Sequence, residues 1–108
     1  PLMVCVDVSE IESVANAALV AAGAAPNVAQ NVAHATAVAE ANGNRICGLY
    51  YLESYCTQLG TGRVNGAVEP VVTTPRPGVV IVDAGFGFAQ PAFAAGLEHA
   101  VAAAHTNG

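Results

Sequence analysis

The residue types in this chain that could do chemistry gather between Asn42 and Leu59. This segment holds Arg45, a cysteine with flexible neighbours (Cys47) and the tyrosines Tyr50 and Tyr51, all near the expected start of a helix. A helix N-terminus attracts anions and favours thiolates. We therefore predict that a substrate carboxylate or a thiolate is stabilised here. The alternative is a plain corner between two helices with a buried cysteine.

A second candidate is the run Gly85-Phe86-Gly87-Phe88-Ala89, between an expected strand and an expected helix. A dinucleotide-binding fingerprint requires this context, but the spacing fits it only loosely. A tight strand-to-helix turn with packed phenylalanines explains the same pattern more simply. We interpret the run as a loop that faces a ligand and not as a Rossmann site, with Gly85 and Gly87 as weak candidates for cofactor contact.

Two other patterns carry less chemistry. Pro1 could act as a base, as in tautomerases, if burial lowered the pKa of its amine, but no cation for binding a substrate stands near it in the sequence. His99 and His105 are six residues apart and point in roughly opposite directions on a helix, while His34 belongs to another helix. The three cysteines include no CxxC pair. We predict neither a metal site nor a disulfide framework, which favours the reducing cytoplasm.

Hydrophobic periodicity predicts the elements that must position these residues. They are helices over about 9–23, 27–41, 48–59 and 92–104, and strands over 68–73 and 79–83. Residues 2–7 alternate and could form a short strand or an extended arm.

The expected element ends rest on local signals. Ser9 with Glu12, and Asn27 with Gln30, predict capping boxes, and Asn42-Gly43 predicts the end of the second helix. Residues 75–78 predict a turn, and the strand at 79–83 is apolar enough to be buried on both faces.

Composition indicates that the chain is covered by other protein. Only 10% of its 108 residues are charged, 54% are hydrophobic, and lysine is absent, whereas soluble domains carry about 25% charged residues. The alanine-rich helical hairpin therefore resembles an assembly surface. A net charge of −5 argues against nucleic acid as a partner. No apolar run approaches the roughly 20 residues of a membrane-spanning helix.

Several short motifs occur in an order and spacing that resemble a known family. They are Ala39–Gly43, Cys47-Gly48-Leu49, Tyr55, Gly62–Asn65, Pro70, Val82–Gly85 and Gly87. From Ser9 to Gly108 the chain resembles the N-terminal third of the malate/L-lactate dehydrogenase family that is unrelated to Rossmann-type enzymes. This family includes ureidoglycolate, sulfolactate and diketogulonate dehydrogenases and the reductases of cyclic imino acids.

The resemblance implies the helix-rich N-terminal portion of a two-domain α/β oxidoreductase that works as a dimer with NAD or NADP. Its substrate would be a 2-oxo acid, a 2-hydroxy acid or a cyclic imine. Residues 1–108 would form a single N-terminal segment without the cofactor-binding domain. We therefore expect this chain alone to be inactive and not to bind NAD(P)H. The expected partner is a second copy in a homodimer or a second chain that carries the remainder of the enzyme.

The resemblance also places the family's reactive residues. The family usually has Ser-His-Gly at this corner and an arginine four residues after the histidine; here these positions hold Ile46, Cys47, Gly48 and Tyr51. A thiol can donate a proton but carries no positive charge, and tyrosine cannot replace a guanidinium group. Arg45 could supply the missing charge beside Gly48. A different substrate, lost activity or residues elsewhere would each explain the change, and a non-catalytic helical dimerisation module is the rival interpretation.

Overall fold

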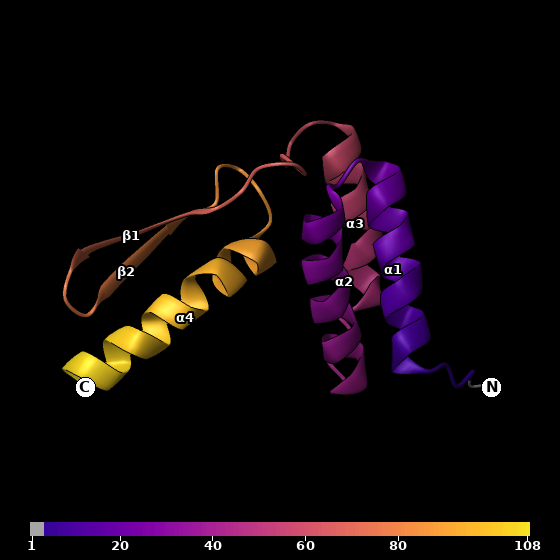
Figure 1. The fold of residues 1–108 in the computed structure, drawn as a ribbon. Helices are drawn as coiled ribbons and strands as arrows, with labels where there is room; N and C mark the ends of the chain where they lie inside the picture. The colour runs from indigo at the N-terminus through magenta and orange to yellow at the C-terminus, as the bar shows by residue number, and fades with distance from the viewer. Residues whose placement is uncertain (1–3) are drawn as a thin grey trace.

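The protein is described here by a computed structural model that covers residues 4–108, and this range holds four helices and a two-stranded sheet (Figure 1). In chain order the elements are α1 (Val8–Ala22), α2 (Pro26–Ala41), α3 (Leu49–Gly60), β1 (Val71–Arg76), β2 (Val79–Asp83) and α4 (Ala89–Asn107). The predicted helix-rich α/β class and the order of its elements are confirmed. Pro1 and the first two residues of the alternating run at 2–7 lie outside the described residues, and residues 4–7 form no strand.

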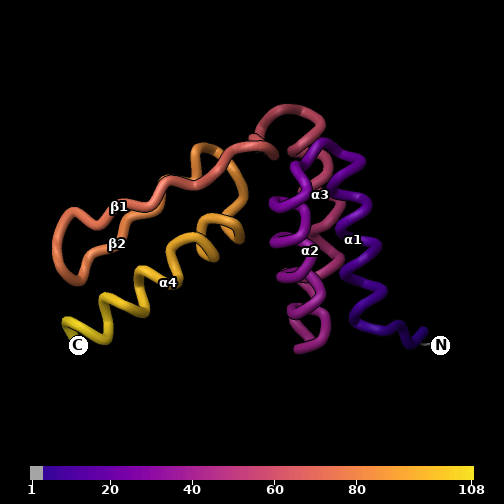
Figure 2. The backbone as a smooth tube through the Cα atoms, in the orientation of Figure 1, coloured from indigo at the N-terminus to yellow at the C-terminus, as the bar shows by residue number. Residues whose placement is uncertain are grey.

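The first three helices form a bundle in which α1 and α2 pack as an antiparallel hairpin (Figure 2). Its core consists mostly of small residues: Ala15, Ala29 and Ala33 are fully buried, and Leu19 and Val32 are among the largest buried side chains. Alanine faces bring helices close together, so close packing stabilises the hairpin more than the burial of large side chains does. A partly buried apolar face of α3 covers this pair.

Both helix starts differ from the predicted capping boxes. The N-cap residues are Asp7 for α1 and Ala25 for α2, and neither makes a side-chain capping bond. The side chain of Glu12 turns outward instead, and its carboxylate lies 2.9 Å from Nδ1 of His34 on α2. Pro26 is the first residue of α2, where its missing N–H costs nothing. The capping predictions were therefore wrong, although the helices themselves were predicted.

The two strands form an antiparallel hairpin. Val72 pairs with Val82, and the register shifts between Thr73 and Arg76. The turn is confined to residues 77 and 78, where Gly78 has a φ of 79°. The predicted turn at 75–78 was too long, because β1 continues through its first two residues.

The first strand begins three residues later than predicted. Val68 does not pair with β2, because its side chain lies against the backbone of Gly85 and Gly87. Because the Val68 side chain makes this contact, the segment before Val71 does not join the β1–β2 pairing. The alternating pattern predicted an extended chain correctly, but it could not show where pairing starts.

Burial of β2 on both faces was also predicted wrongly. The face with Val80 and Val82 lies towards α4, where Gly96 allows close approach to Val82. On the other face Val79 is 40% exposed and Ile81 is 52% exposed. Nothing in residues 4–108 covers that second face, because α4 packs on only one side of the hairpin (Figure 1).

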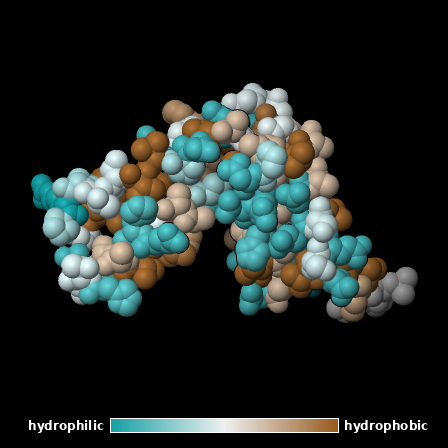
Figure 3. All heavy atoms as spheres, in the orientation of Figure 1, coloured by the Kyte–Doolittle hydropathy of each residue, from teal (hydrophilic) through white to brown (hydrophobic). Residues whose placement is uncertain are grey.

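The molecule is elongated and open. Its radius of gyration is 15.7 Å, against about 13 Å for a compact domain of this length. Its accessible surface is 7221 Å², roughly 1,700 Å² more than the ~5,500 Å² of a compact monomer of this mass. Figure 3 shows apolar side chains at the surface of the hairpin and α4. No helix in residues 4–108 combines the length and the apolar character needed to cross a membrane.

Candidate functional site

The corner between α2 and α3 is closed by backbone bonds. The Asn42 amide donates to the Val38 carbonyl at 3.1 Å, and the Asn42 side chain donates to the same carbonyl at 2.8 Å. The Asn44 amide donates to the Ala39 carbonyl at 2.8 Å. Gly43 has a φ of 77°, a left-handed conformation that glycine adopts without steric cost. The predicted Asn-Gly helix end is confirmed, and it fixes the path of the residues that follow.

The predicted reactive residues lie together on this corner. Arg45 and Cys47 have exposed side chains. The Gly48 amide donates to the Arg45 carbonyl at 3.2 Å, so the turn is tight. Because Cys47 is exposed, it is not the buried corner cysteine of the alternative interpretation. Its role in a reaction stays a prediction.

A row of aromatic rings runs from this corner along α3. Tyr51 is 42% exposed, and its ring centroid lies 5.7 Å from that of Tyr55. Tyr55 in turn packs edge to face against Phe88, with centroids 5.2 Å apart. Gln90 donates a hydrogen bond to the Tyr55 hydroxyl at 3.2 Å. The row joins the corner to the loop before α4, a link that the sequence interpretation did not predict.

The sequence interpretation also missed Glu40. This residue lies in the last turn of α2, and its Oε1 accepts a hydrogen bond of 2.8 Å from the amide of Leu49, the first residue of α3. Gly48 is buried against the Glu40 side chain, where a Cβ would lie 2.5 Å from Oε1. The available signal was a helix that starts after a glycine, which has no capping side chain of its own.

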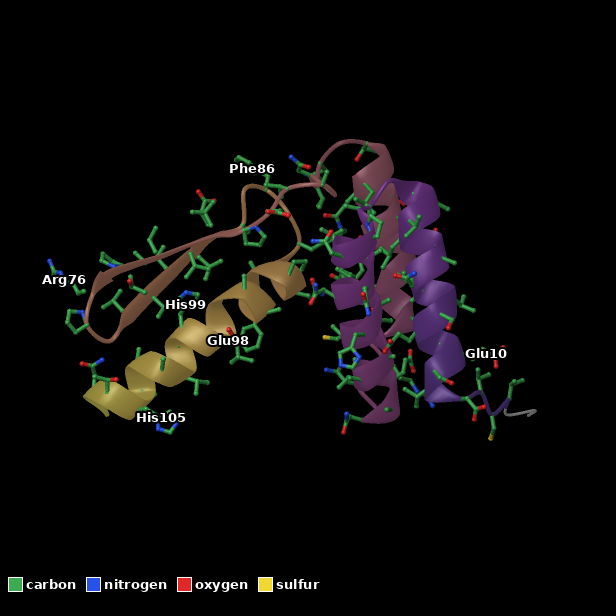
Figure 4. The ribbon with its side chains drawn as sticks, viewed as in Figure 1. Glu10, Arg76, Phe86, Glu98, His99 and His105 are labelled. Carbon is green, nitrogen blue, oxygen red and sulfur yellow. The ribbon has the colours of Figure 1, made fainter. Side chains whose placement is uncertain are left out.

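The glycine loop owes its shape to local packing. The Gly85 amide donates to the Asp83 carboxylate at 2.8 Å. A Cβ on Gly85 or Gly87 would lie 2.6 or 2.7 Å from methyl groups of Val68. Phe86 is 87% exposed with a φ of 62°, and it points away from the chain (Figure 4). These contacts explain both glycines structurally, and cofactor contact stays a prediction.

The remaining titratable groups are dispersed. Burial raises the pKa of the Cys56 thiol, which lies 3.7 Å from the Ala18 carbonyl between α3 and α1. His99 lies on the side of α4 that faces the hairpin, and His105 lies on the other side (Figure 4). Within residues 4–108 no three histidine, cysteine or acidic side chains are placed to hold a metal ion.

Comparison with known proteins gives consistent matches. The family model described as malate/L-lactate dehydrogenase matches residues 6–108. A Delta(1)-pyrroline-2-carboxylate/Delta(1)-piperideine-2-carboxylate reductase from Pseudomonas putida is 37% identical over 106 residues, covering 98% of this chain and 31% of the relative. The enzyme of the same name from Pseudomonas syringae pv. tomato is 40% identical over 73 residues, covering 68% of this chain and 21% of the relative.

The fold also matches a solved structure. The crystal structure of delta1-piperideine-2-carboxylate reductase from Pseudomonas syringae pv. tomato superposes with a TM-score of 0.92 at 31% identity, covering 98% of this chain and 32% of that one. The chain therefore spans about a third of the length of the relatives it matches.

Proposed function

Because this chain belongs to the malate/L-lactate dehydrogenase family, we propose that it is the N-terminal segment of an oxidoreductase that reduces a cyclic imino acid, or a related 2-oxo acid, with NADH or NADPH. The observation that carries the proposal is the superposition on delta1-piperideine-2-carboxylate reductase over 98% of this chain. The relatives are named as reductases of pyrroline and piperideine carboxylates, which favours a cyclic imine over an open 2-oxo acid.

The corner residues are proposed to serve the substrate end of the reaction. When hydride reaches the imine carbon, the amine nitrogen formed must gain or keep a proton, and a thiol or phenol can donate one. Cys47 and Tyr51 are proposed for this role, at the positions where the family usually has histidine and arginine. Neither carries a positive charge, so Arg45 is proposed to hold the substrate carboxylate. Gly48, which is buried against Glu40, is proposed to shape the turn beside that site. The exposure of Arg45, Cys47 and Tyr51 supports this assignment.

The nicotinamide cofactor is proposed to bind mainly to polypeptide outside residues 4–108. Gly85 and Gly87 offer no open cradle for a diphosphate, because the space beside each is filled by Val68. By themselves these residues do not fit a phosphate site. Their proposed role is limited to bordering the ligand through the loop that carries the exposed Phe86.

The remainder of the enzyme is proposed to come from polypeptide that corresponds to the unmatched two-thirds of the relatives, and the enzyme is proposed to be a homodimer. Phe93, Leu97 and Val101 lie four residues apart along α4 and are 71%, 46% and 48% exposed. The excess surface of roughly 1,700 Å² is larger than the ~800 Å² that each partner buries in a standard interface. A small-molecule substrate, no nucleic-acid or membrane partner, and a cytoplasmic location complete the proposal.

A second candidate function is a non-catalytic dimerisation module. The same exposed face of α4 favours it, because an interface of this kind needs no reactive residue. The two functions differ in whether enzyme activity appears when polypeptide that corresponds to the rest of the relatives is added.

Reconstitution tests the proposal. The chain would be mixed with the Pseudomonas putida relative shortened by its N-terminal third, and NADPH consumption followed with Delta(1)-piperideine-2-carboxylate. We expect no NADPH binding and no turnover from the chain alone, turnover from the mixture, and its loss with Leu97→Lys. Fluorescence titration that shows micromolar NADPH binding to the chain alone would contradict the proposal. A stable but inactive complex would favour the dimerisation module.

A further inference from the structure

The first amide of α3 is already bound by a carboxylate of the chain itself. Glu40 accepts a hydrogen bond of 2.8 Å from the Leu49 amide. The N-cap residue Gly48 makes no side-chain capping bond, so Glu40 provides an acceptor for one of the amides that lack a partner at a helix start. Only a glycine at position 48 leaves room for this approach, because a Cβ there would lie 2.5 Å from Oε1 and 2.7 Å from the Glu40 Cγ and Cδ.

Among residues 4–108 no cationic side chain lies within ion-pair distance of this carboxylate, and the single ion pair joins His34 and Glu12. Glu40 and Glu10 instead border a groove of about 530 Å³ whose other walls are mostly apolar. A second carboxylate in the same groove adds to the negative potential on this side of the corner. The partial positive charge of the helix end is then largely neutralised by Glu40, so it attracts a further anion only weakly.

We propose that Glu40 is a positioning and specificity residue that closes the start of α3 to a substrate carboxylate and favours a cationic group beside Cys47. Glu40 acts through Gly48, which is bonded to Cys47, and through its charge. The anion site predicted from the sequence at this helix start is thereby occupied from within the chain. A substrate carboxylate is then held by the exposed Arg45 and not by the helix start, and a positively charged group is favoured near Cys47.

This inference deepens the proposed function and rests on it for the identity of the substrate. A protonated cyclic imine carries its positive charge on the ring nitrogen. Hydride adds to the imine carbon, the C=N π pair moves to nitrogen, and a neutral amine remains. A carboxylate near the thiol favours the protonated imine, the form that accepts hydride more readily. The same carboxylate disfavours a 2-oxo acid bound with its carboxylate at the helix start.

Charged and neutral thiol reagents measure the potential at Cys47 directly. Iodoacetate is an anion and iodoacetamide is neutral, and mass spectrometry of the Cys47 peptide gives both alkylation rates in the 108-residue chain. Glu40→Gln keeps an acceptor oxygen and the side-chain shape but removes the charge. We expect it to raise the iodoacetate-to-iodoacetamide rate ratio about three- to tenfold. Glu53→Gln, on the exposed face of α3, is the matched control and should change the ratio by less than about twofold.

Two further measurements keep the test decisive. Arg45→Gln should lower the ratio, because it removes the opposing charge. In the unaltered chain, added salt should raise the ratio more when the chain is folded than when it is unfolded in urea. Both states carry the same net charge, so the difference in salt dependence reports the charges that folding brings near Cys47. This comparison needs no variant that folds. Equal ratios for the unaltered chain and a folded Glu40→Gln, or identical salt dependence in both states, would overturn the proposal. Reconstitution with NADPH can fail while these ratios behave as expected. A failure of the reductase proposal is therefore distinguishable from a failure of the proposal about Glu40.

Discussion

Replacing Gly48 by alanine should loosen the joint between α2 and α3. The new Cβ would lie 2.5 Å from the Glu40 Oε1, and the flexible carboxylate end can swing away. The cost is then the lost bond to the Leu49 amide. A hydrogen bond to a charged group contributes about 1.5–3 kcal/mol, and the charge at a helix N-terminus adds about 0.3–1 kcal/mol. Because Glu40 is only partly buried, we expect a loss near the lower end, about 2 kcal/mol.

A double-mutant cycle separates this cause from ordinary helix weakening. Gly48→Ala, Glu40→Ala and the double variant should each lose about 2 kcal/mol, because all three remove the same interaction, and the coupling energy should be about 1.5–2 kcal/mol. Urea unfolding followed by circular dichroism measures these values. Gly43→Ala is the control. A Cβ there would meet no atom within 4 Å, so only the left-handed backbone (φ of 77°) opposes it. The variant should therefore lose about 1–2 kcal/mol of stability without coupling to Glu40. Losses that add to within about 0.5 kcal/mol would refute the reasoning.

Three other results follow from the same contacts. Iodoacetamide should alkylate Cys47 faster than Cys56, because Cys47 is exposed and burial raises the Cys56 pKa, so that less Cys56 thiolate forms at neutral pH; peptide mass spectrometry that found equal rates would contradict this. Gly85→Ala should lower the free energy of unfolding by about 1–3 kcal/mol, because its Cβ would lie 2.6 Å from Val68, and an unchanged urea midpoint would contradict the packing role. Tyr55→Phe should cost about 0.5–1.5 kcal/mol through the lost bond from Gln90, and a loss as large as that of Tyr55→Ala would show that the ring contact matters little.

The sequence predicts the helices better than their starts. Periodicity places each helix, because one apolar stripe must face the core. The exact start depends on which backbone amides find partners, and tertiary contacts decide this. Glu12 bonds His34 on the neighbouring helix and not the backbone of its own first turn. The Asn42-Gly43 end is predicted because its signal is local: an amide side chain and a glycine with positive φ suffice.

The candidate site shows the same division. The place of Arg45 and Cys47 follows from their position between two predicted helices, so it could be found by sequence alone. The contact of Glu40 with Leu49 spans nine residues and depends on the path of the whole corner. The glycine loop resembled a ligand-binding motif for another reason. Gly85 leaves space for the side chain of Val68, which lies seventeen positions earlier in the chain. Spacing motifs cannot distinguish a glycine that admits a ligand from one that admits a side chain.

The aromatic row gives the corner and the loop a common frame. Two groups can serve one reaction only if the distance between them is fixed. From Gly48 to Tyr55 the distance is set by α3 itself, at about 1.5 Å per residue, or roughly 10 Å. From Tyr55 to Phe88 it is set by a ring contact of 5.2 Å and by the bond from Gln90. The loop before α4 is therefore joined to the corner through Tyr55 and α3.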